Sequence, residues 1–176
     1  MDCERDDEIE AASSPPSRLP VQKKIFSSSI PRITSATYGG NMNVSGNPNN
    51  DWSYSPGANN MSYIHLKSVT NFSVQGTFPI SRMCPGKYKG MFQLELTNEA
   101  SGWQGCFVVS VMVPGCDAIL ARSNTSVRFG EFNLTTKSFR LTATQRNGSL
   151  GFSLSHEGPG IRKGLIIKRF VIEPAC

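Results

Sequence analysis

Apolar residues in this chain occur in short segments that alternate with polar residues, and turn-forming residues separate the segments. Alternation with a period of two residues is typical of a β-strand with one face in a core and the other in solvent. The longest apolar run, residues 106–113, is interrupted by Ser110, and it is far shorter than the about 18 residues that a membrane-spanning helix needs. The chain is therefore expected to fold from strands, with no membrane span. Only His65 and its neighbours are compatible with a helical turn.

The turn signals divide the sequence into about eight expected strands, a pattern that favours an all-β fold, an antiparallel sandwich or jelly roll. One connection is unusually long: from Gly39 to about Asn60 the chain has seven Asn and four Gly, with Trp52 and Tyr54 among them. Loops of this length inside a compact domain are often functional. The expected strands cover residues 30–37, 69–78, 87–96, 106–113, 127–132, 138–144, 149–155 and 165–172.

Charge is distributed unevenly along the 176 residues. Six of the thirteen acidic residues lie in the first ten positions, where only Arg5 opposes them, so this segment carries −5 and the remainder +10. Ser and Pro dominate the residues that follow, and such a composition buries little apolar surface. We expect an acidic, disordered tail over residues 1–24 and one domain over residues 25–176. An acidic start is also the opposite of a secretory leader, which favours a cytoplasmic or nuclear location.

Residues that carry catalytic or metal chemistry are sparse. The chain has two histidines and five cysteines, without a Cys-x-x-Cys pair, and this spacing matches no zinc site. An odd number of cysteines in a reducing compartment favours free thiols. No nucleophile motif or phosphate-binding loop is present. We therefore expect a binding protein with no enzyme activity, no metal and no cofactor.

Four sequence segments resemble, in the same order, those of the phloem protein 2-like lectin family. Residues 84–88 read Cys-Pro-Gly-Lys-Tyr, and Gly102-Trp103 precedes an apolar segment that ends at Pro114. Residues 129–132 read Phe-Gly-Glu-Phe, and the closing segment 163–174 reads Lys-Gly-Leu-Ile-Ile-Lys-Arg-Phe-Val-Ile-Glu-Pro. The resemblance covers roughly residues 30–174, with a loose match before residue 69.

The resemblance implies a β-sandwich of jelly-roll type that binds N-acetylglucosamine oligomers or N-glycan cores without catalysis. Its partners would be glycans or glycoproteins that contain N-acetylglucosamine. Family members without a leader occur in the cytoplasm and nucleus of plants, where a stress or vascular function is expected. Many members self-associate, so the resemblance is also compatible with a homodimer.

The resemblance implies three candidates for sugar binding: Tyr38, Trp52 and Glu157. Tyr38 stands where the family carries a Trp followed by acidic residues, Trp52 lies at a longer spacing than the family's second Trp, and Glu157 matches without a gap. Aromatic rings stack on the apolar face of a pyranose, and a carboxylate accepts hydrogen bonds from its hydroxyls. The sequence departs from the family at Leu150, where members carry a second acid, and at Ile161, where they carry Trp. Structural interpretations stay open: Trp52 as a hydrophobic plug, Tyr38 as a strand-end core residue, Glu157 as a solvated turn acid.

A second interpretation is a basic RNA-binding or scaffold protein on the same fold. It depends on the net charge of +10 that residues 11–176 carry and on four cations close together in sequence, Arg162, Lys163, Lys168 and Arg169. Such binding would fall steeply with salt concentration. Runs of charge are more often a solvated face, and no aromatic platform for bases is evident in the sequence.

Overall fold

The structure is a computed structural model that describes residues 35–38, 42–56, 62–81, 83–124 and 129–175, with only the backbone given for 35–38. The predicted tail, residues 1–24, and the domain boundary at residue 25 lie outside these residues, so both stay predictions. Within the described residues, no helix has the length and apolar character that crossing a membrane requires.

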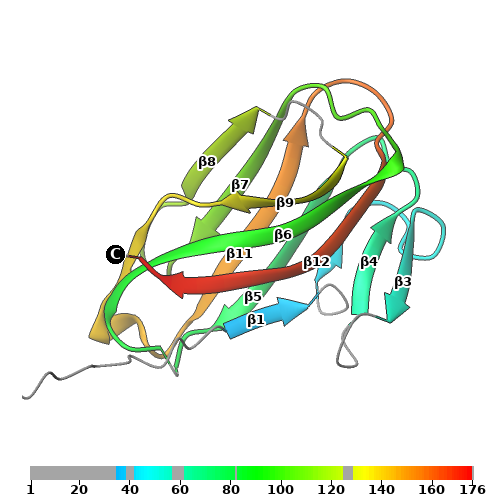
Figure 1. The fold of residues 1–176 in the computed structure, drawn as a ribbon. Coiled ribbons are helices and arrows are strands. Elements are labelled where there is room, and N and C mark those ends of the chain that lie inside the picture. The colour runs from blue at the N-terminus through cyan, green and yellow to red at the C-terminus, as the bar shows by residue number, and fades with distance from the viewer. Residues whose placement is uncertain (1–34, 39–41, 57–61, 82, 125–128, 176) are drawn as a thin grey trace, which may run out of the picture. The chain divides into compact units, whose positions relative to one another are not determined.

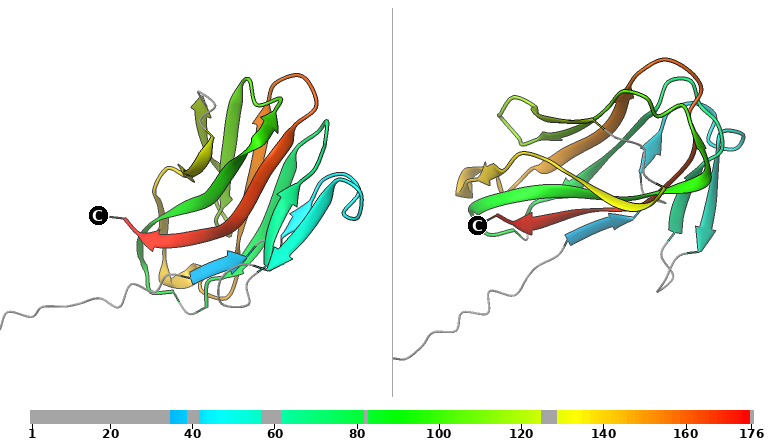
Figure 2. Two further views of the ribbon diagram at one scale, coloured as in Figure 1. Left: turned by 45° about the vertical axis from the view of Figure 1, so that its right-hand side comes forward. Right: turned by 45° about the horizontal axis from the view of Figure 1, so that its top comes forward.

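Two antiparallel sheets pack face to face, as Figures 1 and 2 show. One has seven strands in the order β10-β6-β12-β4-β3, with β1 added beside β12 and β9 beside β6; the other has the order β2-β5-β11-β7-β8. The predicted antiparallel β-sandwich is confirmed. The elements are β1 (Ser35–Tyr38), β2 (Asn43–Val44), β3 (Trp52–Pro56), β4 (Ser62–Leu66), β5 (Ser73–Pro79), β6 (Gly86–Ser101), β7 (Cys106–Met112), β8 (Ile119–Asn124), β9 (Gly130–Thr135), β10 (Phe139–Leu141), the 3₁₀ turn η3 (Ala143–Gln145), β11 (Ser149–Glu157) and β12 (Lys163–Pro174).

The seven-stranded sheet is built on its two longest strands, β6 and β12, which pair along most of their length. Their inner faces carry apolar residues at every second position, as the alternation predicts. The register shifts between Ile167 and Arg169, so that Ile167 and Phe170 are both fully buried. This irregularity leaves Lys168 and Arg169 together, half-buried, between two core residues.

Phenylalanine rings fill the space between the sheets. Phe152 of β11 stacks on Phe170 of β12, with ring centroids 4.1 Å apart and planes 16° apart. Each ring lies over a glycine: a Cβ at Gly76 would be 2.4 Å from Phe152 Cζ, and one at Gly90 would be 2.5 Å from Phe170 Cζ. Since real Cβ atoms do not approach that closely, glycine at both positions is what admits the two rings.

Several sequence-based expectations are wrong in detail. The expected long loop contains β2 and β3, and His65 lies in the middle of β4 rather than in a helical turn. Strand β8 was not among the expected strands, although it forms a hairpin with β7. In each case the strand is short, and its pairing partner, not its own composition, decides the local structure.

A second ring cluster lies toward one end of the sandwich and supports a prediction about stability. Phe72 contacts Trp52, Trp103 and Phe107, with centroid distances of 6.1, 5.2 and 6.3 Å. Truncating a buried Phe removes these contacts and leaves a cavity, so Phe72→Ala should lower the free energy of unfolding by about 3–5 kcal/mol. The control is Phe129→Ala, because Phe129 is 60% exposed and should change stability by less than about 0.5 kcal/mol. Urea denaturation measures both; equal losses would contradict the packing described.

Candidate functional site

Three connections between strands meet at one end of the sandwich: residues 45–51 before β3, 67–72 before β5, and 158–162 before β12. The Ser45 hydroxyl donates to the carbonyl of Asn71 at 2.6 Å, and the Ser45 backbone donates to the carbonyl of Ser73 at 2.8 Å. Val69 and Arg162 exchange two backbone hydrogen bonds of 2.8 and 3.0 Å. These bonds fix the three connections against one another.

Arg162 is the central side chain of this assembly, although only 3% of it is exposed. Its guanidinium donates to the backbone carbonyls of Thr70, Gly158 and Gly160, and its Nε donates to Nδ1 of His156 at 3.0 Å. A buried charge is costly unless hydrogen bonds replace its hydration. Here backbone carbonyls provide that replacement, and in doing so they hold the 158–162 turn against residues 69–70.

Two glycines allow the 158–162 turn and the residue before it to pack closely against residues 102–105. A Cβ at Gly102 would be 2.0 Å from the carbonyl oxygen of Ile161, and one at Gly105 would be 2.0 Å from that of Glu157. Trp103, between these glycines, is fully buried and donates from Nε1 to the carbonyl of Lys163 at 2.8 Å. Trp103 therefore has a packing role at this turn.

A cavity of about 430 Å³ opens between the three connections. Its wall combines hydroxyl, amide and carboxylate groups with two aliphatic side chains, and one of these, Ile161, is 54% exposed. The Asp51 carboxylate accepts a hydrogen bond from the backbone N–H of Asn47 at 2.7 Å, and this bond fixes the carboxylate in the cavity wall. We call this space the loop-end cavity; it is lined by Ser45, Gly46, Asp51, Ser68, Val69, Thr70, Asn71 and Ile161.

Trp52 does not offer a ring face to a ligand, which corrects the sequence-based expectation. Its side chain is 1% exposed and packs on Phe72, and its Nε1 donates to the carbonyl of Ser45 at 2.7 Å. The open alternative, a hydrophobic plug, is what the structure contains. Trp52 contributes to the loop-end cavity indirectly, because it holds the backbone of one wall residue. The exposed aromatic of β3 is Tyr54, 52% exposed.

Glu157 ends β11, directly before the turn that carries Ile161, and its side chain is exposed. Its carboxylate pairs with the guanidinium of Arg122 on β8 at 3.1 Å. The hydrogen bond from Arg122 lowers the pKa of this carboxyl from its usual value, so it stays ionised at neutral pH. An ionised carboxylate is an acceptor only, which suits a donor O–H or N–H.

The remaining predicted positions are placed less directly. Tyr38 ends β1 and its backbone is in register with Arg169; its side chain lies outside the described part of the structure, so its role stays a prediction. Leu150 is fully buried in the core, and no acid at the surface replaces it on that strand before Glu157. The sequence reasoning missed Asp51, Thr70 and Asn71. All three lie in polar segments between strands, and these segments were the available signal.

The four cations of the RNA interpretation do not form an exposed patch, because only Lys163 among them is exposed. Arg162 is buried, as described above, and Lys168 bonds the carboxylates of Glu95 and Glu131. Arg169 donates to the amide oxygen of Gln93 at 2.6 Å. Within the described residues no group of three or more His, Cys, Asp or Glu could hold a metal ion, and Cys84, Cys106 and Cys116 are free thiols.

Comparison with known proteins adds a family. The family model of phloem protein 2 matches residues 40–174. A lectin from Luffa acutangula is 26% identical over 129 residues, which are 70% of this chain and 61% of the relative; the chain thus spans about three fifths of that relative's length.

Solved structures with similar folds include two carbohydrate-binding modules. One belongs to Cellvibrio mixtus lichenase 5A and was solved in complex with cellotriose; it is 8% identical, with a TM-score of 0.45 over 81% of this chain and 98% of the module. The other is a family 35 module from Clostridium thermocellum, 10% identical, with a TM-score of 0.45 and the same coverage of 81% and 98%.

The environment of His156 predicts how stability responds to pH. Because its Nδ1 accepts from Arg162, the ring is neutral in the fold; burial, and then the charge of Arg162, lower its pKa below the ordinary 6.5. Between 6.5 and this lowered pKa the unfolded chain binds the proton and the folded chain does not, so the free energy of unfolding falls as the pH drops below about 6.5. His156→Gln should flatten this slope between about pH 7 and pH 5 in urea denaturation. Because carboxylates titrate in both the unmodified protein and the variant, only the difference between the two slopes reports on His156. Identical slopes would contradict the lowered pKa of His156.

Proposed function

The chain belongs to the phloem protein 2 family, and from this premise we propose that it is a non-catalytic lectin for N-acetylglucosamine oligomers or N-glycan cores. The lectin from Luffa supports carbohydrate binding as the general activity. The observation that carries the proposal at the level of residues is the composition of the loop-end cavity.

The chemistry of that cavity suits an amino sugar. A pyranose presents hydroxyls around its rim and C–H groups on its faces, and an N-acetyl group adds one N–H, one carbonyl and one methyl group. The hydroxyls of Ser68 and Thr70 and the amide of Asn71 line the cavity and bond no other described side chain. Ile161 supplies exposed apolar surface beside them. Polar and apolar groups thus converge in one space of about 430 Å³.

Glu157 does not line the cavity, but we propose it as a hydrogen-bond acceptor for a sugar bound there. It directly precedes the turn that contributes Ile161, and its ionised carboxylate accepts a sugar hydroxyl or the acetamido N–H. Tyr38, at the end of β1, is proposed as an additional aromatic contact. An RNA-binding or scaffold function has less support, because Arg162 and Lys168 already satisfy their hydrogen bonds within the protein.

The first test addresses the apolar contact. Ile161→Asp should weaken the binding of N-acetylglucosamine trimer at least about tenfold, or about 1.4 kcal/mol, because it puts a solvated charge against the sugar face. The melting temperature should not change, since Ile161 is 54% exposed. Isothermal titration calorimetry measures the affinity. The matched control is Phe129→Asp, an exposed apolar residue outside the cavity, which should bind as the unmodified protein does. Equal affinities of the unmodified protein and the two variants would show that the loop-end cavity does not bind the sugar.

The second test separates the carboxylate from its ion pair. Glu157→Gln should weaken trimer binding, because a neutral amide is a poorer acceptor than a carboxylate. Arg122→Gln breaks the same Arg122–Glu157 pair but leaves the carboxylate in place, so its affinity should stay within about twofold of the unmodified protein. If both variants lose affinity equally, the ion pair matters and Glu157 does not contact the sugar.

A further inference from the structure

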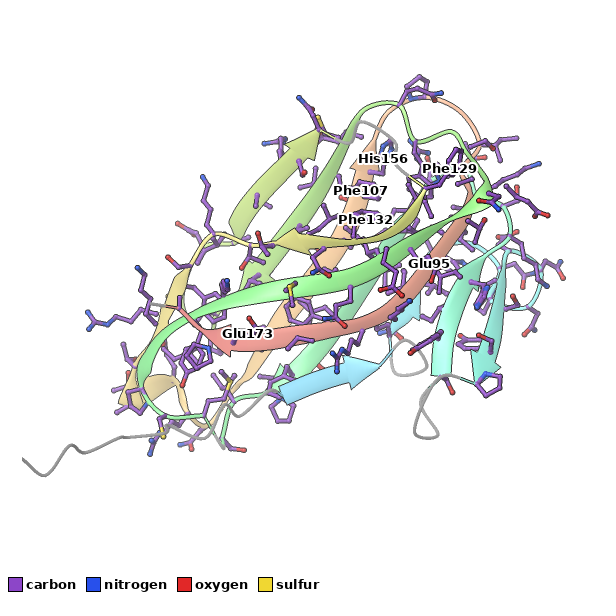
Figure 3. All side chains as sticks on the ribbon, viewed as in Figure 1. Glu95, Phe107, Phe129, Phe132, His156 and Glu173 are labelled. Carbon is purple, nitrogen blue, oxygen red and sulfur yellow. The ribbon has the colours of Figure 1, made fainter. Side chains whose placement is uncertain are left out.

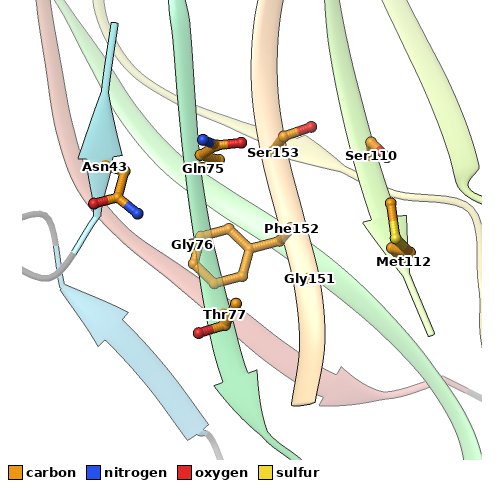
Figure 4. Close-up of a pocket in the computed structure, with 9 residues that line it drawn as sticks. All are labelled: Asn43, Gln75, Gly76, Thr77, Ser110, Met112, Gly151, Phe152 and Ser153. Carbon is orange, nitrogen blue, oxygen red and sulfur yellow. The ribbon is translucent and has the colours of Figure 1, made fainter. Parts of the chain in front are cut away.

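The outer face of the five-stranded sheet carries a row of polar side chains that crosses the strands. Asn43 of β2 pairs with Gln75 of β5, Gln75 with Ser153 of β11, and Ser153 with Ser110 of β7. Since residues in register on adjacent strands point to the same side, the four side chains stand next to one another, as Figure 4 shows. Amide and hydroxyl groups therefore follow each other at the spacing of the strands, about 4.8 Å.

A groove of about 350 Å³ runs along this row. Asn43, Gln75, Thr77, Ser110 and Ser153 line it with the apolar side chain of Met112, which is 56% exposed, and with the backbone of β5 and β11. None of these residues lines the loop-end cavity.

The groove is electrically neutral, because no charged residue lines it. On the same face Arg122 and Glu157 pair with each other. Among the described residues, the side chains of Gln75, Ser110 and Ser153 make no hydrogen bond to another side chain, so their donors and acceptors face solvent. A neutral ligand rich in hydroxyls complements such a surface, whereas a polyanion would find no cation there.

Gly151 is the observation that points to an occupant. Its φ is not in the positive region, and a Cβ at this position would meet only Met112, at the ordinary distance of 3.5 Å. The fold therefore does not require glycine here, unlike at Gly76, where the ring of Phe152 excludes a side chain. Glycine within a strand lowers stability and often marks a bulge, a bend, or a close approach by a ligand or another backbone. The register of β11 with β5 runs through Gly151 without a bulge. Its effect at this position is to keep the groove open between Thr77 and Met112.

We propose that this groove is a second binding site, separate from the loop-end cavity, for a neutral oligosaccharide in an extended conformation. The chain of sugars lies across β2, β5, β11 and β7, a span of about 14 Å, which matches about three pyranose units. Hydroxyls of successive units bond Asn43, Gln75, Ser153 and Ser110 in turn. One sugar ring lies over Gly151, against the apolar side chain of Met112. The site does not rest on the loop-end cavity, because the two share no residue.

The test compares long and short ligands on matched variants. Gly151→Val fills the groove, and Ser149→Val is the control, because Ser149 lies on the same strand and face but outside the groove. The ligands are hexamers of β-1,4-linked N-acetylglucosamine, glucose and xylose, together with the N-acetylglucosamine trimer, measured by calorimetry. Amide chemical shifts of the labelled protein locate the ligand.

We expect at least one hexamer to shift the amides of Gln75, Ser110 and Ser153, and Gly151→Val to weaken that hexamer about tenfold. Ser149→Val should bind as the unmodified protein does, and Gly151→Val should melt no lower, because a β-branched residue suits a strand. Gln75→Ala, which removes one amide without adding volume, should weaken the hexamer about threefold.

The proposal is overturned if no hexamer binds at millimolar concentration, if the shifts leave out these three amides, or if both Gly151→Val and Gln75→Ala bind as the unmodified protein does. The variants distinguish this outcome from a failure of the proposed function. Ile161→Asp acts at the loop-end cavity and leaves the groove unchanged, whereas Gly151→Val and Gln75→Ala act at the groove and leave the loop-end cavity unchanged, so each site is tested by its own variants.

Discussion

The stacking of Phe152 on Phe170 is the contact on which the arrangement of both candidate sites depends. It joins the middle of one sheet to the middle of the other, at a centroid distance of 4.1 Å. The two rings belong to β11 and β12, which follow each other in the chain. Their stacking therefore fixes where the connection between these strands emerges. That connection carries Ile161 and is preceded by Glu157, while the other face of β11 forms the floor of the groove.

At the loop end of the sandwich, two buried indole rings hold the backbone around the loop-end cavity. Trp52 and Trp103 are both buried; Trp52 donates its indole N–H to the carbonyl of Ser45, in the connection before β3, and Trp103 donates its own to the carbonyl of Lys163, the first residue of β12. His156 packs against Phe107, with ring centroids 5.0 Å apart (Figure 3), and against Trp103, with ring centroids 5.2 Å apart. A rigid base of this kind reduces the conformational entropy that the loops lose when a ligand binds.

Much of the fold could be predicted from the sequence, because alternation reports directly which face of a strand is buried. The segment around Phe92 was identified this way, whereas the segment around Val109 was identified as a nearly continuous apolar run; both contribute to the core. Alternation says nothing about which strands pair. Strands β2 and β3 were therefore missed within a segment rich in Asn and Gly, and their pairing with β5 and β4 sets their structure.

The site was harder to predict than the fold for the same reason. A Trp in a polar segment has the same sequence signature whether its ring faces solvent or the core, and only the position of Phe72 beneath Trp52 decides between the two. Glu157 was identified through a motif, and the structure places it at the surface beside the turn. Thr70 and Asn71 carry no motif, and they enter the cavity wall because the Val69–Arg162 bridge brings distant segments together.

Arg162 holds its turn through carbonyl oxygens, which every amino acid possesses. The geometry of the turn is consequently independent of most of the side chains that it displays. Exchanges at Ile161 change what the turn presents to a ligand while the backbone keeps its course. A turn held in this way can change the chemistry of its surface one residue at a time, without re-optimising the scaffold at each step.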